Sequence, residues 1–425
     1  MLDTRTNPFL FFTNVVLDQA LYWICFLPVI VFLLHQLHCR TPTVPKGCRR
    51  LGLPLHQSNL KDEYKHKYSQ KTPNIYTDEN GHYPYRIKAL FTYPIKSCSA
   101  IELDTADVVP AGFMYDRQFC FAEYITPKSS KTLGGKSQPQ WTLRTLRDGE
   151  FSRMVLIRPE IWIPDPTSRE YRSDLDEVKS EGVMIIFYPR IITDSVFASY
   201  FAKLGIRLGL LSRELSFRVP LTPSSDSISS YPLTPVKIFS ACPMAYDYGQ
   251  HIPQALRGFL CASNSARGPI TLFRECPSYR REVFRCAPRK EKLGFQPVTR
   301  FADVYPINLM NLASVHDVAS RCVASISRLS IRRFRANIII QGPSAFVEDS
   351  WKRIRIQPQH GNDCDGIEIY TVSRTMRCKL PNVDPDTGIR HPTEPDRTLR
   401  SYRRIDQGDP TNACLGMQLV PTVRG

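Results

Sequence analysis

Residues 85–98 read Tyr-Arg-Ile-Lys-Ala-Leu-Phe-Thr-Tyr-Pro-Ile-Lys-Ser-Cys, and this stretch decides the fold. Apolar residues alternate with polar ones between positions 85 and 91, which predicts a half-buried strand that ends at Tyr93-Pro94. Lys96 and Ser97 then fall on a loop just past the strand. A lysine, a hydroxyl and backbone N–H groups in such a loop can hold a phosphate, although a solvated turn is the alternative.

Working outward, other short segments have strand character: Gln118–Ala122, Met154–Ile157, Asn337–Ile340, Trp351–Ile356 and Ile367–Thr371. A helical stripe of apolar residues covers positions 313–322, with Asn311 or Ser314 placed to cap its start. A second, short helix face is expected over 399–405. Many short strands with few helices predict a mixed α/β, β-rich fold built as barrels.

The chain has 425 residues, enough for two or three domains, and a formal net charge of +16. That charge permits attraction to an anionic membrane, nucleic acid, a phosphorylated ligand or an acidic protein. The sequence has neither an RNA-binding aromatic motif nor zinc-finger spacing, so we expect no nucleic-acid partner. Its 13 cysteines are scattered, without a C-x-x-C pair, which favours reduced thiols over disulfides, zinc ribbons or redox pairs.

An apolar, uncharged segment over 20–38 is long enough to cross a bilayer. Arg40, Lys46, Arg49 and Arg50 follow it, and the positive-inside rule therefore puts the rest of the chain on the cytosolic side. A cleaved signal peptide is the alternative, but neither a basic segment before the run nor a small-residue cleavage site after it supports one. Residues 39–83 are polar and predict a tether between a membrane anchor and a catalytic body.

Cys378 stands in Met376-Arg377-Cys378-Lys379, shortly before the sharp turn Asp384–Gly388. A lone cysteine usually serves packing. An adjacent cation such as Arg377, however, favours the thiolate, which is the form that binds a metal or attacks a substrate. Nucleophilic hydrolysis is not supported, because the sequence has no G-x-S-x-G elbow, no H-E-x-x-H and no P-loop.

Two further polar pairs are candidate ligand contacts. Arg117, in Asp116-Arg117, can grip a phosphate or a pterin edge with two hydrogen bonds, or it can form a surface ion pair. Asn337, in Arg335-Ala336-Asn337, offers donors and an acceptor that suit the mixed edge of a heterocycle. The alternative for Asn337 is a polar start to the strand that follows.

In combination, these segments resemble the MOSC family, and most closely its membrane-anchored, amidoxime-reducing members. The resemblance covers about 85–419, with a divergent stretch near 160–235. Its motifs, in the order of the family, are Tyr93–Cys98, Gly112–Arg117, Phe301-Ala302-Asp303 with Pro306, Phe334–Asn337, Glu348–Trp351, Arg377-Cys378 and Val383–Gly388. It implies a MOSC N-terminal β-barrel domain over 84–240, with an insertion at about 160–235, and a MOSC β-barrel domain over 241–425. A single transmembrane helix would precede both.

The resemblance also implies a molybdenum cofactor, a pterin whose dithiolene holds the metal while the protein adds one cysteine thiolate. Cys378 alone matches that metal ligand and catalytic residue. The positions that match cofactor contacts are Lys96, Ser97, Arg117, Asn311, Ser314, Arg335, Asn337 and Arg377. Thiolate is a soft ligand, which suits such a metal centre.

The implied activity is reduction of N-hydroxylated compounds, such as amidoximes and hydroxylamines. Electrons would come from NADH through cytochrome b5 reductase and cytochrome b5, with the catalytic body on the cytosolic side of the mitochondrial outer membrane. The alternative is a non-catalytic MOSC protein that carries the cofactor or sulfur. A cofactor sulfurase is disfavoured, because no pyridoxal-phosphate domain precedes the MOSC half.

The chain departs from the family near its end. Leu415-Gly416-Met417-Gln418 stands where the family tends to carry Phe-Gly-x-Tyr, which removes a tyrosine contact to the cofactor. The chain stops at Arg424-Gly425, where relatives run on through one more strand, so an open sheet edge is expected there.

Overall fold

The computed structural model describes residues 23–24, 26–33, 44–65, 85–126, 138–192, 196–261, 267–357 and 366–422. The chain divides into two compact units. The larger comprises Pro45–Tyr188 and Phe217–Gly425 and contains the candidate site, and the smaller comprises Met1–Val44 and Pro189–Ser216.

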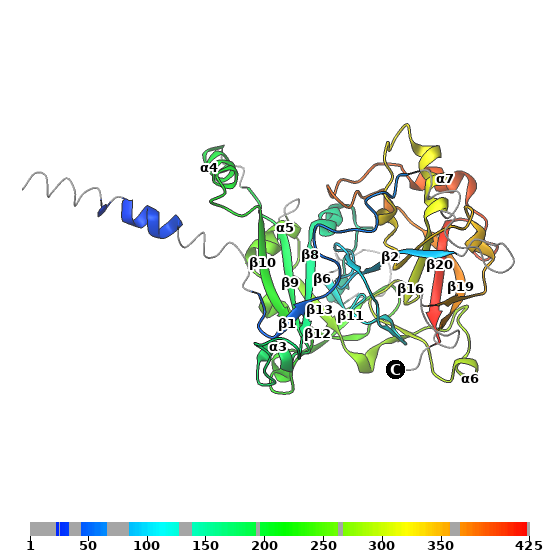
Figure 1. Ribbon diagram of the computed structural model, residues 1–425, viewed down its shortest axis with the longest axis horizontal. Coiled ribbons are helices and arrows are strands. Elements are labelled where there is room, and N and C mark those ends of the chain that lie inside the picture. Colours follow the sequence, from blue (N-terminus) through cyan, green and yellow to red (C-terminus); the bar gives the residue numbers. More distant parts are fainter. Residues whose placement is uncertain are drawn as a thin grey trace, which may run out of the picture. The chain divides into compact units, whose positions relative to one another are not determined.

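A seven-stranded sheet in the larger unit has the order β18-β19-β20-β16-β17-β2-β3. Its strands are β2 (Arg86–Thr92), β3 (Ile101–Leu103), β16 (Ile307–Asn311), β17 (Ile338–Gln341), β18 (Arg353–Ile356), β19 (Ile367–Arg377) and β20 (Ala413–Pro421). The β16–β17 pair is parallel. β20 lies between β19 and β16, with its neighbour β19 beside it in Figure 1, so it is not an edge strand.

β2 confirms the strand predicted from the alternation near its start. It pairs with β17, where Leu90 lies opposite Ile338, and with β3 on its other side. Helices α7 (Leu312–Cys322) and α8 (Asp396–Tyr402) contribute apolar residues to the core that covers this sheet. An N-terminal segment is therefore built into a sheet whose other central strands come from the last third of the chain.

The second main element is a closed barrel of five strands. Its strands are β6 (Phe119–Ile125), β7 (Gln140–Leu143), β11 (Leu233–Lys237), β12 (Met244–Asp247) and β13 (Ile270–Glu275). Alternate residues of these strands, among them Cys120, Ala245 and Phe273, form its buried core. One expected barrel is thus present, whereas the other large sheet of the described residues is the seven-stranded one. The barrel and the seven-stranded sheet each contain strands from both sides of residue 240, the boundary expected between the two domains.

A four-stranded sheet has the order β1-β8-β9-β10. Its strands are β1 (Cys48–Arg50), β8 (Arg158–Pro164), β9 (Val183–Pro189) and β10 (Glu214–Pro220). The divergent stretch at 160–235 therefore supplies most of this sheet, and the smaller unit holds α4 (Val196–Arg207). The other elements are β4 (Val108–Val109), β5 (Gly112–Phe113), β14 (Arg281–Glu282), β15 (Val298–Thr299), α3 (Asp176–Lys179), α5 (Gln254–Cys261), α6 (Lys290–Leu293), and the 3-10 helices Gly149–Leu156, Ile228–Ser230, Gly249–His251, Pro277–Tyr279, Ile331–Phe334, Val347–Ser350 and Leu380–Asn382.

Two further expectations differ from the structure. Met154–Ile157, expected as a strand, lies mostly in the 3-10 helix Gly149–Leu156, because Phe151, Met154 and Val155 bury one helical face. Residues 45–65, expected as part of the tether, pack on the larger unit. Glu63 is buried there and accepts hydrogen bonds from Ser330 Oγ at 2.8 Å and the Ile331 amide at 2.9 Å.

The predicted membrane anchor over 20–38 lies partly outside the described residues. Its described part, residues 23–24 and 26–33, is helical. Across the described ranges, we find no helix with the length and apolar character needed to cross a membrane.

Candidate functional site

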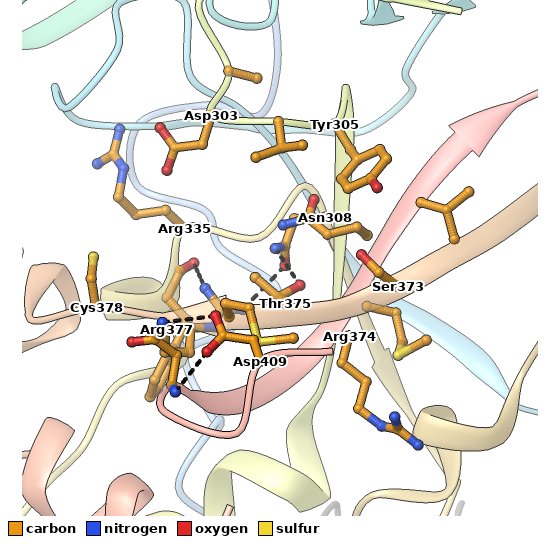
Figure 2. A pocket seen from close by; sticks show the side chains of 18 of the residues that line it. Asp303, Tyr305, Asn308, Arg335, Ser373, Arg374, Thr375, Arg377, Cys378 and Asp409 are labelled. Carbon is orange, nitrogen blue, oxygen red and sulfur yellow. Dashed lines mark hydrogen bonds between the residues drawn. The ribbon is translucent and has the colours of Figure 1, made fainter. Parts of the chain in front are cut away.

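Residues of β16, β19 and β20, together with loops from both halves of the chain, line a cavity of about 680 Å³ (Figure 2). Seven of the nine predicted site residues lie on its wall: Lys96, Ser97, Arg117, Arg335, Asn337, Arg377 and Cys378. A volume of this size is typical of a cofactor or small-molecule site. The fold thus gathers at one cavity residues that the sequence separates by up to 282 positions, between Lys96 and Cys378.

The remaining two predicted residues, Asn311 and Ser314, do not line the cavity. Asn311 Nδ2 donates to Glu348 Oε2 at 2.9 Å, and Ser314 Oγ donates to Glu348 Oε1 at 2.6 Å. Burial raises the pKa of Glu348, and these two hydrogen bonds oppose that rise. Asn311 also caps α7 by accepting from the Ala313 amide. Both residues therefore bond a buried carboxylate, and Asn311 also caps a helix. A match to family positions could not reveal these roles.

Five residues of the cavity wall have a left-handed backbone that is uncommon for residues other than glycine, and three of them are predicted ligand contacts. The φ angles are 70° for Ser97, 47° for Arg117 and 55° for Arg335, and those of Phe239 and Cys286 are 54° and 57°. Such conformations cost free energy, on the order of 1–3 kcal/mol each, and they cluster at functional sites. Their occurrence at three predicted ligand contacts supports a functional role for this cavity.

Cys378 is the first residue after β19, and its side chain is partly exposed to the cavity. The cation that contacts its sulfur is not the adjacent Arg377 but Arg147, whose Nε lies 3.2 Å from Cys378 Sγ. Arg377 is buried and donates to the carbonyl oxygens of Leu415 and Phe334 at 2.8 and 3.0 Å. Burial lowers the pKa of Arg377 to about 10. Arg377 therefore ties β19 to its neighbours, and Arg147 meets the thiol.

Arg147 and Lys96 share one carboxylate, that of Asp303. Lys96 Nζ lies 2.5 Å from Asp303 Oδ1 and also donates to the Phe301 carbonyl at 2.6 Å, while Arg147 pairs with the other carboxylate oxygen. Burial lowers the pKa of Lys96 to about 8, against the opposing effect of Asp303. Burial alone would raise the pKa of Asp303, but the two cations outweigh it and the pKa is lowered.

Asn337 lines the cavity, and its side chain is fully hydrogen-bonded by the protein. Its Nδ2 donates to the Phe91 carbonyl and to Asp116 Oδ1 at 3.1 and 2.9 Å. Its Oδ1 accepts from Arg117 at 3.0 Å and from the Asn308 amide at 3.1 Å. Asn337 thus positions Arg117 and joins neighbouring strands, and it has no amide group left for a heterocycle.

Arg335 differs from Asn337, because part of its side chain has no hydrogen-bond partner among the described residues. Its guanidinium is buried, and the donor without such a partner is Nη2. Burial lowers its pKa to about 10. A buried donor left unpaired is costly, so its presence at a cavity wall points to an acceptor supplied by a ligand.

The charges around Lys96, Arg335 and Cys378 fit an anionic group. Five cations, Lys96, Arg117, Arg147, Arg335 and Arg377, face two carboxylates, those of Asp116 and Asp303. A phosphorylated pterin carries the anionic oxygens and hydrogen-bond acceptors that such a donor set requires, and Cys378 offers a sulfur ligand for its metal. The residues therefore fit a molybdenum cofactor.

The other charged residues of the cavity wall are of both signs. They are Arg285, Lys352 and Arg374 and Asp349, Asp406 and Asp409, and Figure 2 shows Arg374 on the side away from Cys378. Gln418, at the position of the family's tyrosine, also lines the cavity. Nearby Gly416 has a φ of 77°, and a Cβ there would lie 2.4 Å from the Leu309 carbonyl oxygen, so the backbone requires glycine.

Comparison with known families identifies the class. The MOSC domain matches residues 296–417, and the MOSC N-terminal β-barrel domain matches residues 85–161. The chain therefore contains a MOSC domain and a MOSC N-terminal β-barrel domain, as the sequence motifs predicted. The described cavity draws residues from both matched regions, with Lys96, Ser97 and Arg117 from the first and Arg335 and Cys378 from the second.

Among curated relatives, the chain is similar to mitochondrial amidoxime-reducing components. It is 30% identical to component 1 of Danio rerio over 203 residues, which is 48% of this chain and 55% of the relative. It is 34% identical to component 1 of Homo sapiens over 109 residues, which is 26% and 29% of the two chains. The chain thus spans about half or less of these relatives. A molybdenum cofactor sulfurase of Oryza sativa subsp. japonica is 24% identical over 331 residues, 75% of this chain and 31% of the relative.

Proposed function

We propose that this chain is a molybdenum-cofactor-dependent oxidoreductase that reduces N-hydroxylated compounds. The observation that carries the proposal is Cys378, a partly exposed thiol in a cavity where cations outnumber carboxylates and Arg335 presents an unpaired donor. Bound molybdenum would supply two-electron chemistry that breaks an N–O bond and releases the oxygen as water after uptake of two protons. The similarity to amidoxime-reducing components favours this substrate class.

In the proposal, the residues in and around the cavity have different roles. Cys378 supplies the metal ligand, and Arg335 and Arg117 donate to the anionic oxygens of the cofactor. Asn337 and Tyr93 hold those two arginines, since Asn337 bonds Arg117 and the Tyr93 ring lies under both guanidinium groups. Lys96 and Ser97 complete the anion contacts from the first loop.

The first test is metal content. Purified protein matured with the cofactor should contain about one molybdenum per chain, and Cys378→Ala should contain much less. Cys286→Ala is a matched control, because Cys286 is an exposed thiol that lines the same cavity. Normal molybdenum in the Cys378 variant, or loss only in the Cys286 variant, would refute the assigned ligand.

The second test is turnover. We propose that electrons come from NADH through cytochrome b5 reductase and cytochrome b5, and that the protein works at the mitochondrial outer membrane. Reduction of an amidoxime should be measured with these two proteins and, separately, with a chemical reductant. Activity with the chemical reductant alone would reject this electron-transfer chain and leave the substrate class standing.

A second candidate is a non-catalytic carrier of the cofactor or of sulfur. The similarity to a molybdenum cofactor sulfurase and the glutamine at position 418 favour it. Stoichiometric molybdenum without reduction of any N-hydroxylated compound, by either source of electrons, would select this candidate.

A further inference from the structure

Arg147 contacts the candidate metal ligand, although neither its neighbours nor a family motif marks it in the sequence. Its Nε donates to Cys378 Sγ at 3.2 Å, across 231 positions of the chain. The distance is that of an N–H···S hydrogen bond. A donor to a sulfur withdraws electron density from it and is one of the ways in which proteins set the reduction potential of a sulfur-bound metal.

The geometry holds the Arg147 guanidinium on three sides. Asp303 pairs with its Nη2, Cys378 Sγ accepts from its Nε, and the Phe239 ring lies 5.3 Å from its central carbon. Lys96 in turn fixes Asp303 from the other carboxylate oxygen. An arginine side chain loses considerable rotamer freedom when it is held in this way, so this many contacts indicate a defined position.

The conformation of Phe239 is an independent observation that supports a defined position for the Arg147 guanidinium. It lies in the turn between β11 and β12, its φ is 54°, and 56% of its surface is exposed. A bulky residue in that backbone conformation is unusual, and an exposed aromatic ring there contributes little to the core. Its ring instead covers Arg147 at the cavity wall.

We infer that Arg147 is a positioning residue that holds the Cys378 sulfur in its ligand position and draws electron density from it. The inference rests on the proposed function, because it assigns Arg147 a role toward the metal that Cys378 would bind. Arg147 itself need not touch substrate. Removing its N–H donor should make the bound metal harder to reduce, which lowers the reduction potential, or should weaken retention of the metal.

The experiment compares wild type, Arg147→Gln, Arg147→Lys and Phe239→Leu after cofactor loading. Molybdenum per chain is measured by elemental analysis, and the midpoint potential by a redox titration that follows the Mo(V) signal in electron paramagnetic resonance. Arg153→Gln is the control, since Arg153 is an exposed arginine of the adjacent 3-10 helix. Thermal denaturation checks that each variant is folded.

We expect a lower potential or lower molybdenum content in Arg147→Gln, a smaller change in Arg147→Lys and Phe239→Leu, and none in Arg153→Gln. Potential and metal content equal to wild type in both Arg147 variants would overturn the inference. If Arg147→Gln does not fold, the same two readouts on Arg147→Lys and Phe239→Leu decide it. A wild type without molybdenum refutes the proposed function instead, so the two failures are distinguishable.

Discussion

The central guanidinium carbon of Arg335 lies 4.3 Å from the centre of the Tyr93 ring, and that of Arg117 lies 4.4 Å from the same centre. Two cations therefore share one aromatic ring in a buried setting, where each contact is worth up to about 2 kcal/mol. The ring compensates part of the repulsion between them. It does not satisfy Arg335 Nη2, which remains without a hydrogen-bond acceptor.

Arg335→Met should therefore stabilise the cofactor-free protein and weaken cofactor retention. Removing a buried donor without an acceptor should raise the free energy of unfolding by about 1–3 kcal/mol. Loss of a charged hydrogen bond to the ligand should weaken retention by about tenfold or more. Urea unfolding of the cofactor-free protein and molybdenum analysis after dialysis measure the two effects.

Arg274→Met is the matched control for this prediction. Arg274 is also buried, but its guanidinium donates to the carbonyls of Leu221 and Glu275, at 2.5 and 3.0 Å, and to Thr222 Oγ1 at 3.0 Å. Its loss should lower the free energy of unfolding by about 1–3 kcal/mol. If both variants are destabilised alike, the unpaired state of Arg335 has no energetic significance.

Ser314→Ala should affect stability and not cofactor content per folded molecule. It removes the 2.6 Å hydrogen bond to the buried Glu348 carboxylate, at a cost of about 1–3 kcal/mol. The measurements are urea unfolding and molybdenum per chain in the folded fraction. Selective loss of molybdenum without loss of stability would restore Ser314 to the cofactor site.

Lys96 should make stability and anion retention depend on pH in opposite directions. Its folded-state pKa of about 8 lies below the ordinary value of 10.5, so between these pH values the unfolded chain binds more protons. The stability that Lys96 contributes is therefore present above pH 10.5 and is lost as pH falls through 8, by about 3 kcal/mol in total. Retention of an anionic cofactor should instead weaken as pH rises through 8, because Lys96 loses its charge.

The measurement for Lys96 is the difference in unfolding free energy between wild type and Lys96→Met across pH 7–11. Other groups titrate equally in both proteins and largely cancel. A difference that does not change across this range would show that Asp303 keeps the Lys96 pKa at its ordinary value.

Glu63→Ala should destabilise the protein although Glu63 lies in a segment that looks like a linker. The change removes acceptors from Ser330 Oγ and the Ile331 amide, both buried, at a cost of about 1–3 kcal/mol. Chemical unfolding measures it, and Lys61→Ala, at an exposed position nearby, is the control. Equal stability of the two variants would mean that the contacts around Glu63 do not stabilise the fold.

The local elements of the fold were largely predictable from periodicity. The alternation that begins at 85 and the apolar run at 338–340 each correspond to a strand, and the stripe at 313–322 corresponds to α7 with its predicted cap at Asn311. Met154 was assigned wrongly, because a short apolar run does not distinguish a strand from a buried helical turn. The joining of β2 to β17 is a long-range pairing that no local pattern encodes.

At the site, motif order predicted seven residues that line the cavity but not what each one does. Asn337 and Arg377 line the cavity, yet their polar groups are largely bonded to the protein itself. Arg147 was missed because its contact with Cys378 depends on the path of a distant loop. Glu348 belongs to a sequence motif, but nothing in that motif indicates that its carboxylate bonds both Asn311 and Ser314.

The insertion of β2 between β17 and β3 has a consequence for how the protein folds during synthesis. Asn337 Nδ2 bonds the Phe91 carbonyl across 246 positions, so this pairing has a very high contact order. A ribosome must translate about 250 further residues before β2 meets its neighbour, a delay of about 10–50 seconds. Until then β2 has one unpaired edge, and the cavity, whose wall includes Asn337 and Cys378, forms only when the chain is nearly complete.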